Sequence, residues 1–406
     1  MRVLVYPHMM EMGGSQMNAL ELARQMGERG HEMVVFAPDG ELVELANSWG
    51  LEVARAPAAH SWPSMRNMIA LDRLIRERGI DLAHAYEWGP AVELAFGPHL
   101  LRHTPLVVSV MSMDVPAHIP THLPLILGTR SLIAGQIGLR PDLQLIEPPV
   151  DTTANSPTDA VTARGRWKFR TDEIVISVVC RLVTEHEKVQ GVLDAIDAVE
   201  ALADSHRLRL LVVGDGEGLE QVSARANAVN SRRGTDTVIV TGRLLDPREA
   251  YDAADIMFGM GGSAIKSLAF GKPLVVQGSG GFWRLLDEHS LPIFLEQGWF
   301  GHGGNGKPDL IRELRKLLDN ENHRNRLGAL GRSLAVERFS LLSASSLLEG
   351  IYRTAVDAPT AAAAKTLSLG QSAIEVGKYK TVMGSRRLRT SMARRKSTAT
   401  PTGTPS

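Results

Sequence analysis

The sequence has a single cysteine, Cys180, among its 406 residues. One cysteine cannot form an internal disulfide and gives no spacing for a structural zinc site. No run of about 18 or more apolar residues is present, so the sequence offers no candidate for a membrane-spanning helix. The apolar stretch in MRVLVYPH is too short for the core of a signal peptide, and we therefore expect a cytoplasmic protein.

A net charge is also lacking, because 45 Lys and Arg balance 45 Asp and Glu. The charges are unevenly distributed, however: residues 365–396 hold nine Lys or Arg and one acid, giving +8 (9 − 1), so the remainder carries −8. A negative body disfavours nucleic-acid binding. Residues 357–406 are rich in Ala, Ser, Thr and cations, and we expect a disordered tail whose deletion from residue 366 leaves the fold intact. Such a tail is either simply solvated or attracted to anionic membranes.

Short apolar runs alternate with helical patterns along most of the chain, which predicts βαβ units and parallel sheets. The length favours two domains. The alternation stops at residues 148–151, a polar segment follows over 152–166, and a new apolar run begins at 173. We therefore predict two doubly wound α/β domains, residues 1–160 and 161–340.

Glycines follow several of the predicted strands, where open α/β sheets bind their ligands. They are Gly13, Gly14, Gly214, Gly216, Gly259, Gly261, Gly262, Gly280 and Gly281. Bare amides at the start of a helix favour an anion such as phosphate, although each glycine pair is equally compatible with a plain tight turn. The spacing G-x-G-x-G from Gly214 does not fit the dinucleotide fingerprint. Several such loops in one domain favour an anionic ligand more than any single loop does.

Two cations, Arg181 and Lys188, follow the predicted strand at 173–179. Arginine binds phosphate through a planar fork and lysine as a point charge, so the pair is suited to clamp a diphosphate. Lys266 adds a charge one turn into the helix after Ser263. Isolated surface cations are otherwise simply solvated.

Hydrolytic and zinc motifs are missing from the sequence. We find no nucleophile elbow with a Ser-His-Asp order, no H-E-x-x-H and no C-x-x-C. The histidines of the first half, His8, His31, His84, His118 and His122, are candidates to orient a sugar or to act as a base, or are structural.

A specific resemblance emerges from the order of several motifs. Gly13-Gly14-Ser-Gln and the segment 28–32 resemble the N-terminal pattern of the family-4 retaining glycosyltransferases of the GT-B fold. In the second half, Arg181 and Lys188 resemble the diphosphate-binding pair of that family. The segments LLVVGDGE, VIVTGRLLD and AFGKP also correspond, and the similarity covers roughly residues 1–356.

The resemblance implies a GT-B enzyme that moves a sugar, with retention, from a nucleoside-diphosphate donor in the second domain to an acceptor at the first, without a metal or another cofactor. Arg181 and Lys188 would act on the leaving diphosphate. The other expected donor contacts are Gly13, Gly14, Gly214, Gly216, Glu217, Arg243, Leu244, Phe258, Gly259, Gly261, Gly262, Ser263, Lys266, Gly280 and Gly281. The expected acceptor-side residues are His84, Glu87, Asp114 and His118. A helix over 341–356 would cross back to the first domain.

The sequence departs from the family pattern at two glutamates that normally lie eight residues apart. Phe258 and Lys266 stand in their places. Met111 also stands where the family often has a histidine, for which His118 is a possible substitute. A GT-B protein that binds a nucleotide sugar or a protein partner without transferring anything therefore remains an alternative. An epimerase or phosphorylase on the same fold is a further one. The acceptor is a sugar, a lipid-linked molecule or another small molecule.

Overall fold

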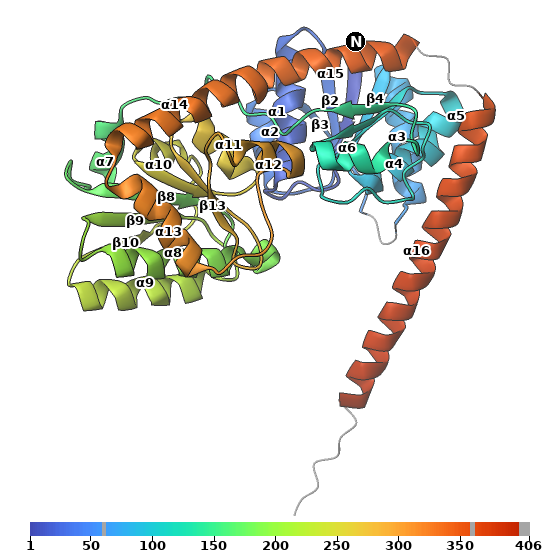
Figure 1. The fold of residues 1–406 in the computed structure, drawn as a ribbon. Helices are drawn as coiled ribbons and strands as arrows, with labels where there is room; N and C mark the ends of the chain where they lie inside the picture. The colour runs from blue at the N-terminus through green and yellow to red at the C-terminus, as the bar shows by residue number, and fades with distance from the viewer. Residues whose placement is uncertain (59–61, 358–361, 398–406) are drawn as a thin grey trace, which may run out of the picture.

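Two α/β domains, each built on one sheet, make up the body of the computed structural model (Figure 1). Residues 1–58, 62–357 and 362–397 are described, with side chains in the last segment described for 363–383. The two sheets lie on either side of a cleft, which confirms the predicted doubly wound architecture.

The first sheet has seven parallel strands in the order β3-β2-β1-β4-β5-β6-β7. They are β1 (Arg2–Tyr6), β2 (Glu32–Ala37), β3 (Glu52–Arg55), β4 (Leu82–Tyr86), β5 (Leu106–Val110), β6 (Leu125–Leu127) and β7 (Leu143–Leu145). The central strands are buried on both faces, which explains their continuous apolar runs. The covering helices are α1 (Gly14–Glu28), α2 (Leu42–Ser48), α3 (Met65–Arg78), α4 (Trp88–Leu94), α5 (Leu100–Arg102) and α6 (Arg130–Gln136), with a π-helical turn at Ala95–His99.

The second sheet has six strands in the order β10-β9-β8-β11-β12-β13, and only β13 is antiparallel to its neighbour. They are β8 (Ile174–Val179), β9 (Leu208–Val213), β10 (Val238–Val240), β11 (Ile256–Gly259), β12 (Leu274–Gln277) and β13 (Trp283–Leu285). The helices are α7 (Ala160–Arg166), α8 (Lys188–Leu202), α9 (Leu219–Arg233), α10 (Arg248–Asp252), α11 (Gly262–Ala269), α12 (Leu291–Gln297), α13 (Lys307–Leu318) and α14 (Glu321–Arg338), with a 3-10 turn at Glu185–Glu187. In each domain the carboxyl ends of the parallel strands share one edge of the sheet.

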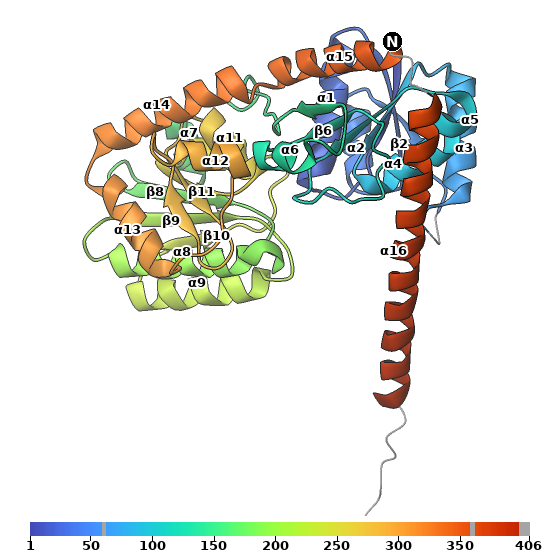
Figure 2. The ribbon, with the colours of Figure 1, turned by 45° about the vertical axis from the view of Figure 1, so that its right-hand side comes forward.

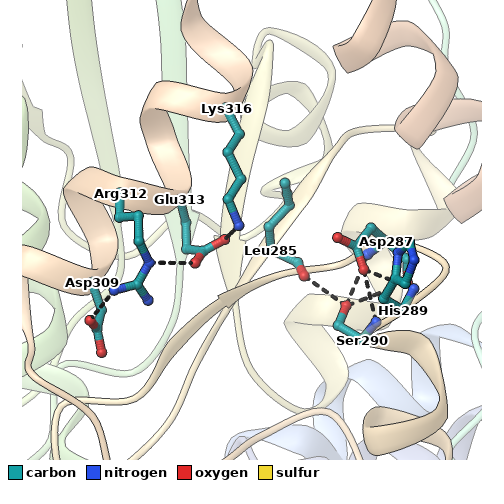
Figure 3. A network of polar contacts seen from close by, with 8 residues as sticks. All are labelled: Leu285, Asp287, His289, Ser290, Asp309, Arg312, Glu313 and Lys316. Carbon is teal, nitrogen blue, oxygen red and sulfur yellow. Dashed lines mark hydrogen bonds and ion pairs between the residues drawn. The ribbon is translucent and has the colours of Figure 1, made fainter.

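Helix α13 carries a chain of ion pairs that supports a nearby loop (Figure 3). Arg312 links Asp309 to Glu313, which Lys316 also contacts at 2.5 Å. Asp309 in turn accepts a hydrogen bond from the backbone N–H of Asn305 at 2.9 Å. The helix therefore fixes the loop at 300–306, which packs on the glycines after β12.

The chain crosses between the domains twice, and the two crossings touch. Val150 N–H donates to Phe339 O at 2.7 Å, and Leu341 N–H donates to Val150 O at 2.9 Å. Helix α15 (Leu341–Asp357) then lies against the first domain, although it follows the second in sequence (Figure 1). Tyr352 on α15 is buried in the core of the first domain.

The last helix, α16 (Ala362–Ser397), starts against the first domain and projects away from the body (Figures 1 and 2). Leu369 joins the core of the first domain, Lys365 Nζ donates to His99 O at 2.8 Å, and Ser372 Oγ donates to His118 O at 2.5 Å. The expectation of a disordered tail is therefore wrong for residues 362–397. Ser368 and Ser372 are buried beside Leu369, so small polar side chains contribute to this packing together with a few apolar ones. Residues 358–361 and 398–406 of that prediction lie outside the described part.

Candidate functional site

A cleft of about 1960 Å³ separates the two domains, and both line it. It lies at the carboxyl ends of the strands of both sheets, as expected for doubly wound folds. On the first domain the loop after β1 contributes Gly13 and Gly14, which open α1. These two predicted residues therefore lie in the cleft.

Glu87 ties together three elements at the edge of the first sheet. Its Oε1 accepts hydrogen bonds from Ser15 Oγ at 2.9 Å, Met111 N at 2.9 Å and Ser112 N at 3.2 Å, and its Oε2 accepts one from Ser112 Oγ at 2.8 Å. The backbone of Glu87 has φ +69°, a left-handed conformation that is costly for a residue with a Cβ. This turn places the next residue, Trp88, in the cleft. Glu87 thus lines the cleft as predicted, but with its carboxylate fully occupied it acts as a positioning group.

Arg181 and Lys188 both line the opposite wall, on the loop that joins β8 to α8. The loop holds two successive left-handed residues, His186 and Glu187, each at φ +55°. Burial lowers the pKa of Lys188, and the charge of Arg181 lowers it further. The nearest acidic partner of Arg181 is Glu185, with Nη2 and Oε2 3.4 Å apart and both side chains about half exposed. Such a pair is weak, so the guanidinium is available to an anionic ligand.

Two glycines let the strand ends of the second sheet approach each other. A Cβ on Gly214 would lie 1.8 Å from Cys180 O, and one on Gly216 would lie 2.5 Å from Leu182 O. Both positions therefore require glycine, and both line the cleft. The turn from β9 is thereby packed directly behind the loop that carries Arg181.

The N-terminus of α11 faces the cleft with little side-chain cover. Gly261, Gly262 and Ser263 line it, and Gly261 has φ +55° and ψ −131°, a conformation that only glycine adopts readily. Lys266 lies one turn further along the helix and also lines the cleft. Across the domain gap, burial raises the pKa of Glu21 on α1, and the charge of Lys266 opposes this shift. The N–H of Gly261 donates to Trp299 O at 2.7 Å, and the first turn of α11 beyond it forms an anion-favouring corner together with the lysine.

The charges of the cleft are divided between its two walls. All the Lys and Arg side chains among the described lining residues, Arg181, Lys188, Arg243 and Lys266, belong to the second domain. Leu244, also predicted, lies beside Arg243 in the lining. The first-domain wall has no Lys or Arg among the described residues. The cationic side chains available to an anion in the cleft therefore come from the second domain.

Three predicted acceptor-side residues do not line the cleft. His84 is fully buried in the middle of β4, where its Nδ1 lies 2.7 Å from Tyr352 Oη and its Nε2 lies 2.8 Å from Ser109 Oγ. Direct contact between His84 and an acceptor is excluded, because both ring nitrogens are occupied within the core. His118 is covered by aromatic rings, and Asp114 is exposed outside the cleft.

Five predicted donor contacts also lie elsewhere. Phe258 is buried against Trp283. Gly259 is packed against the start of α11, where a Cβ would lie 3.0 Å from Ala264 N. Glu217 accepts hydrogen bonds from Thr184 N and Oγ1 at 2.8 and 2.6 Å, and so it anchors the loop of Arg181 from outside the cleft.

The glycines after β12, Gly280 and Gly281, make hydrogen bonds within the protein. Gly280 N–H donates to Glu187 Oε2 at 2.8 Å, and Gly281 O accepts from Gly306 N–H at 2.9 Å. The loop at 300–306 covers this turn, so its amides are not offered to a ligand.

Several cleft residues were not among the donor and acceptor contacts expected from the sequence. His8 lines the cleft at the end of β1, where its Nε2 lies 3.3 Å from Gln16 Nε2, and burial lowers its pKa. Trp62 and Trp88 line the cleft as a T-shaped pair with ring centroids 4.3 Å apart. The signal for His8 and Trp88 was their position directly after predicted strands.

Membrane spans and metal clusters are both missing from residues 1–58, 62–357 and 362–397. None of the helices there combines the length and the apolar character needed to cross a bilayer. No group of three or more His, Cys, Asp or Glu side chains in the same residues is arranged to hold a metal ion.

Each of the two domains matches the model of a known glycosyltransferase family. Residues 12–152 match Glycosyltransferase Family 4, and residues 173–320 match the Glycosyl transferases group 1 family. No curated protein matches the sequence.

Solved structures resemble the whole body of the chain. A glycosyltransferase from Rickettsia africae has a TM-score of 0.72 at 13% identity, covering 88% of this chain and 99% of its own. HepE from Anabaena in complex with UDP has a TM-score of 0.70 at 15% identity, covering 87% and 100%. The same protein in complex with UDP-glucose has a TM-score of 0.68 at 16% identity, covering 87% and 99%. At these identities the likeness shows the fold.

The two facing domains and the cleft between them define a protein of the GT-B class. Within that class, the chain belongs to the glycosyltransferases, with a family-4 first domain and a group 1 second domain.

Proposed function

We propose that this protein is a retaining, metal-independent glycosyltransferase that takes a sugar from a nucleoside-diphosphate donor. The observation that carries the proposal is the gathering of Arg181, Lys188, Arg243 and Lys266 on the second-domain wall, together with the bare amides of α11. A diphosphate is the ligand whose charge such a wall neutralises. HepE, a similar fold, binds UDP and UDP-glucose, so a uridine donor is the first to test.

The proposed chemistry is electrostatic. The bond between the anomeric carbon and the diphosphate oxygen breaks, and a bond from the acceptor oxygen forms on the same face of the sugar. The proton of the acceptor hydroxyl passes to the departing diphosphate. Charge grows on the diphosphate in the transition state, where Arg181 and Lys188 stabilise it. Closure of the domains excludes water that would otherwise hydrolyse the donor.

Thermal shift with UDP, UDP-glucose and other nucleotide sugars tests the donor site without an acceptor, because a ligand that binds only the folded state raises Tm. We expect UDP to stabilise the chain and Lys188→Ala to remove most of the effect. The proposal is overturned if no nucleoside diphosphate or nucleotide sugar raises Tm. Cytoplasmic localisation, which we expect from the sequence, stays a prediction.

A second function is favoured by one observation. Lys266, rather than an acid, lines the cleft on α11, and Phe258 is buried. A protein that binds a nucleotide sugar, or a protein partner, without transferring the sugar would show donor binding with neither product formation nor slow donor hydrolysis. Release of UDP from UDP-glucose over hours distinguishes the two functions.

We also propose that α16 makes peripheral contact with an anionic membrane. It is a single helix that leaves the body, and residues 378–396 of its sequence hold eight Lys or Arg and no acid. Each cation near an anionic lipid surface contributes about 1 kcal/mol of attraction. The exposed apolar side chains of Leu367 and Ile374 are seven residues, about two helical turns, apart and so lie on the same face.

A further inference from the structure

The first-domain wall of the cleft is apolar where a ligand would touch it. We call this surface the apolar wall. Its side chains are exposed or half-buried, and they lie beyond the ends of β1, β4 and β5 and on one loop after β3. It consists of Met9, Met12, Trp62, Trp88, Met111 and Met113.

Three of the four methionines of this wall are not core residues, whereas Met111 packs partly against the core of the first domain. Met9 and Met12 are each 39% exposed and Met113 is 48% exposed. Exposed apolar side chains that gather in one place mark a binding surface, and methionine adapts its shape to varied apolar partners. Packing of the domain itself therefore does not explain them.

Several acids on the first-domain side of the cleft already accept hydrogen bonds or form ion pairs within the protein. Glu87 accepts four hydrogen bonds, and Glu93 accepts hydrogen bonds from Ser64 N, Asn67 Nδ2 and Tyr6 Oη.

Two more wall acids meet arginines. Glu41 pairs with Arg243, and Glu147 pairs with Arg338, each at 2.6 Å. The first-domain side of the cleft has no Lys or Arg among the described residues, so it offers a phosphate no cationic side chain. Glu11 and Asp39 also line this side and are exposed, and the other surface left for contact includes the apolar wall.

From these observations we infer that the acceptor is an amphiphile whose uncharged apolar group lies against the apolar wall, with its reacting hydroxyl toward the cations of the second domain. This inference rests on the proposed function, because it takes the first-domain wall to be the acceptor side. An alkyl or aryl group removes this surface from water, at about 25 cal/mol for each Å² buried.

Helix α16 reaches the same corner of the molecule. The ring of Tyr379 lies 5.7 Å from that of Trp62 and 5.4 Å from that of Trp88. The helix proposed to touch an anionic membrane therefore packs beside two residues of the apolar wall before it leaves the body. An amphiphile held in an anionic membrane that α16 touches would have a short path into the cleft.

The test uses octyl β-D-glucoside below its micelle concentration, with methyl β-D-glucoside as the matched probe that lacks the chain. Binding to the full chain with UDP present is followed by the fluorescence of its tryptophans. We expect the octyl glucoside to bind at least about tenfold more tightly, since several methylenes are buried. Equal affinity for the two glucosides would overturn the inference.

Substitutions separate the wall from the rest of the surface. Met9→Gln together with Met113→Gln changes exposed side chains of similar size, and should weaken octyl glucoside about five- to tenfold. Met65→Gln is the control, because Met65 is 69% exposed on α3 and does not line the cleft. Undiminished binding to the double variant, or an equal loss in the control, also rejects the inference.

Titration with UDP keeps the two proposals apart. Loss of UDP binding in the unmodified chain would count against the donor site and the proposed function. Normal UDP binding without a preference for the octyl chain would reject the amphiphilic acceptor alone.

Discussion

Arg243 Nη1 lies 2.6 Å from Glu41 Oε2, and this ion pair joins the second domain to the first across the cleft. The other oxygen of Glu41 accepts a hydrogen bond from Met12 N–H at 2.8 Å. Arg243 lowers the pKa of the Glu41 carboxyl, and the Met12 hydrogen bond lowers it further. The loop in front of α1 is therefore coupled to the loop after β10 through one carboxylate.

This ion pair should hold the domains together in the unliganded chain. Glu41→Arg places like charges opposite one another, so we expect a larger radius of gyration by solution X-ray scattering. Exchange of the two charges, Glu41→Arg with Arg243→Glu, should restore the original value. Glu44→Arg, an exposed substitution on α2, is the matched control. Because an exposed pair contributes only up to about 1 kcal/mol, the change is a shift in population, and no shift at all would contradict the coupling.

Arg181→Ala should weaken UDP binding about ten- to 100-fold. A hydrogen bond to a charged group contributes about 1.5–3 kcal/mol, and each 1.4 kcal/mol is about a factor of ten in affinity. Isothermal titration measures the change directly. Arg66→Ala removes an exposed arginine from α3, outside the cleft, and should leave the affinity unchanged. If the Arg181 variant binds UDP as tightly as the unmodified chain, Arg181 does not bind the diphosphate.

His84 should make the chain less stable in mild acid. Burial lowers the pKa of His84 to about 3, whereas a histidine in the unfolded chain has a pKa near about 6.5. Between these values the unfolded chain binds a proton that the folded chain does not, so the free energy of unfolding falls as the pH drops below about 6.5.

Urea unfolding at pH 7.5 and 5.5 checks this sign. The loss of stability between the two pH values should be about 1 kcal/mol larger for the unmodified chain than for His84→Gln, which cannot titrate. His323→Gln, a change at a half-buried histidine on α14, should keep the full pH dependence. Identical pH dependence in the unmodified chain and the His84 variant would show that the buried imidazole is not responsible.

Much of the fold follows from local patterns. The apolar run at 173–179 was expected to be a strand and is β8, because a strand buried on both faces needs an unbroken apolar run. Arg181 and Lys188 were also placed correctly in the cleft, since both follow the carboxyl end of β8. The rule that ligands bind beyond strand ends therefore carried the main features of the site.

The errors arose where distant segments decide the outcome. The turn at Gly280 and Gly281 looked free in sequence, but Glu187 accepts the N–H of Gly280, and the carbonyl of Gly281 accepts the N–H of Gly306 from the loop at 300–306. His84 lies within β4, and its partner Tyr352 arrives from α15, 268 residues later. Composition alone also predicted disorder for α16, whose contacts combine serines and a lysine with Leu369 and Tyr379.

The contacts of α16 change what truncation should do. Removal of residues 366–406 takes away Leu369 and Ser372, which are buried against the first domain, so we now expect a lower Tm. A chain that ends at residue 383 keeps these contacts and should melt as the full chain does. Differential scanning fluorimetry compares the three lengths, and equal Tm for all of them would mean that the docked part of α16 contributes nothing to stability.

The chain that ends at residue 383 also tests the membrane contact. It lacks Arg386, Arg387, Arg389, Arg394, Arg395 and Lys396. Sedimentation with vesicles of phosphatidylglycerol and phosphatidylcholine should carry down the full chain and much less of the shortened one. Pure phosphatidylcholine vesicles should carry down little of either, because the attraction depends on anionic head groups. Binding should also weaken as salt is raised from about 0.05 to about 0.5 M. The Debye length falls from about 10 Å to a few Å over this range, so the attraction between exposed charges and the membrane is screened at shorter distances. Equal sedimentation of the two chains would show that the cations of α16 do not hold the protein at the membrane.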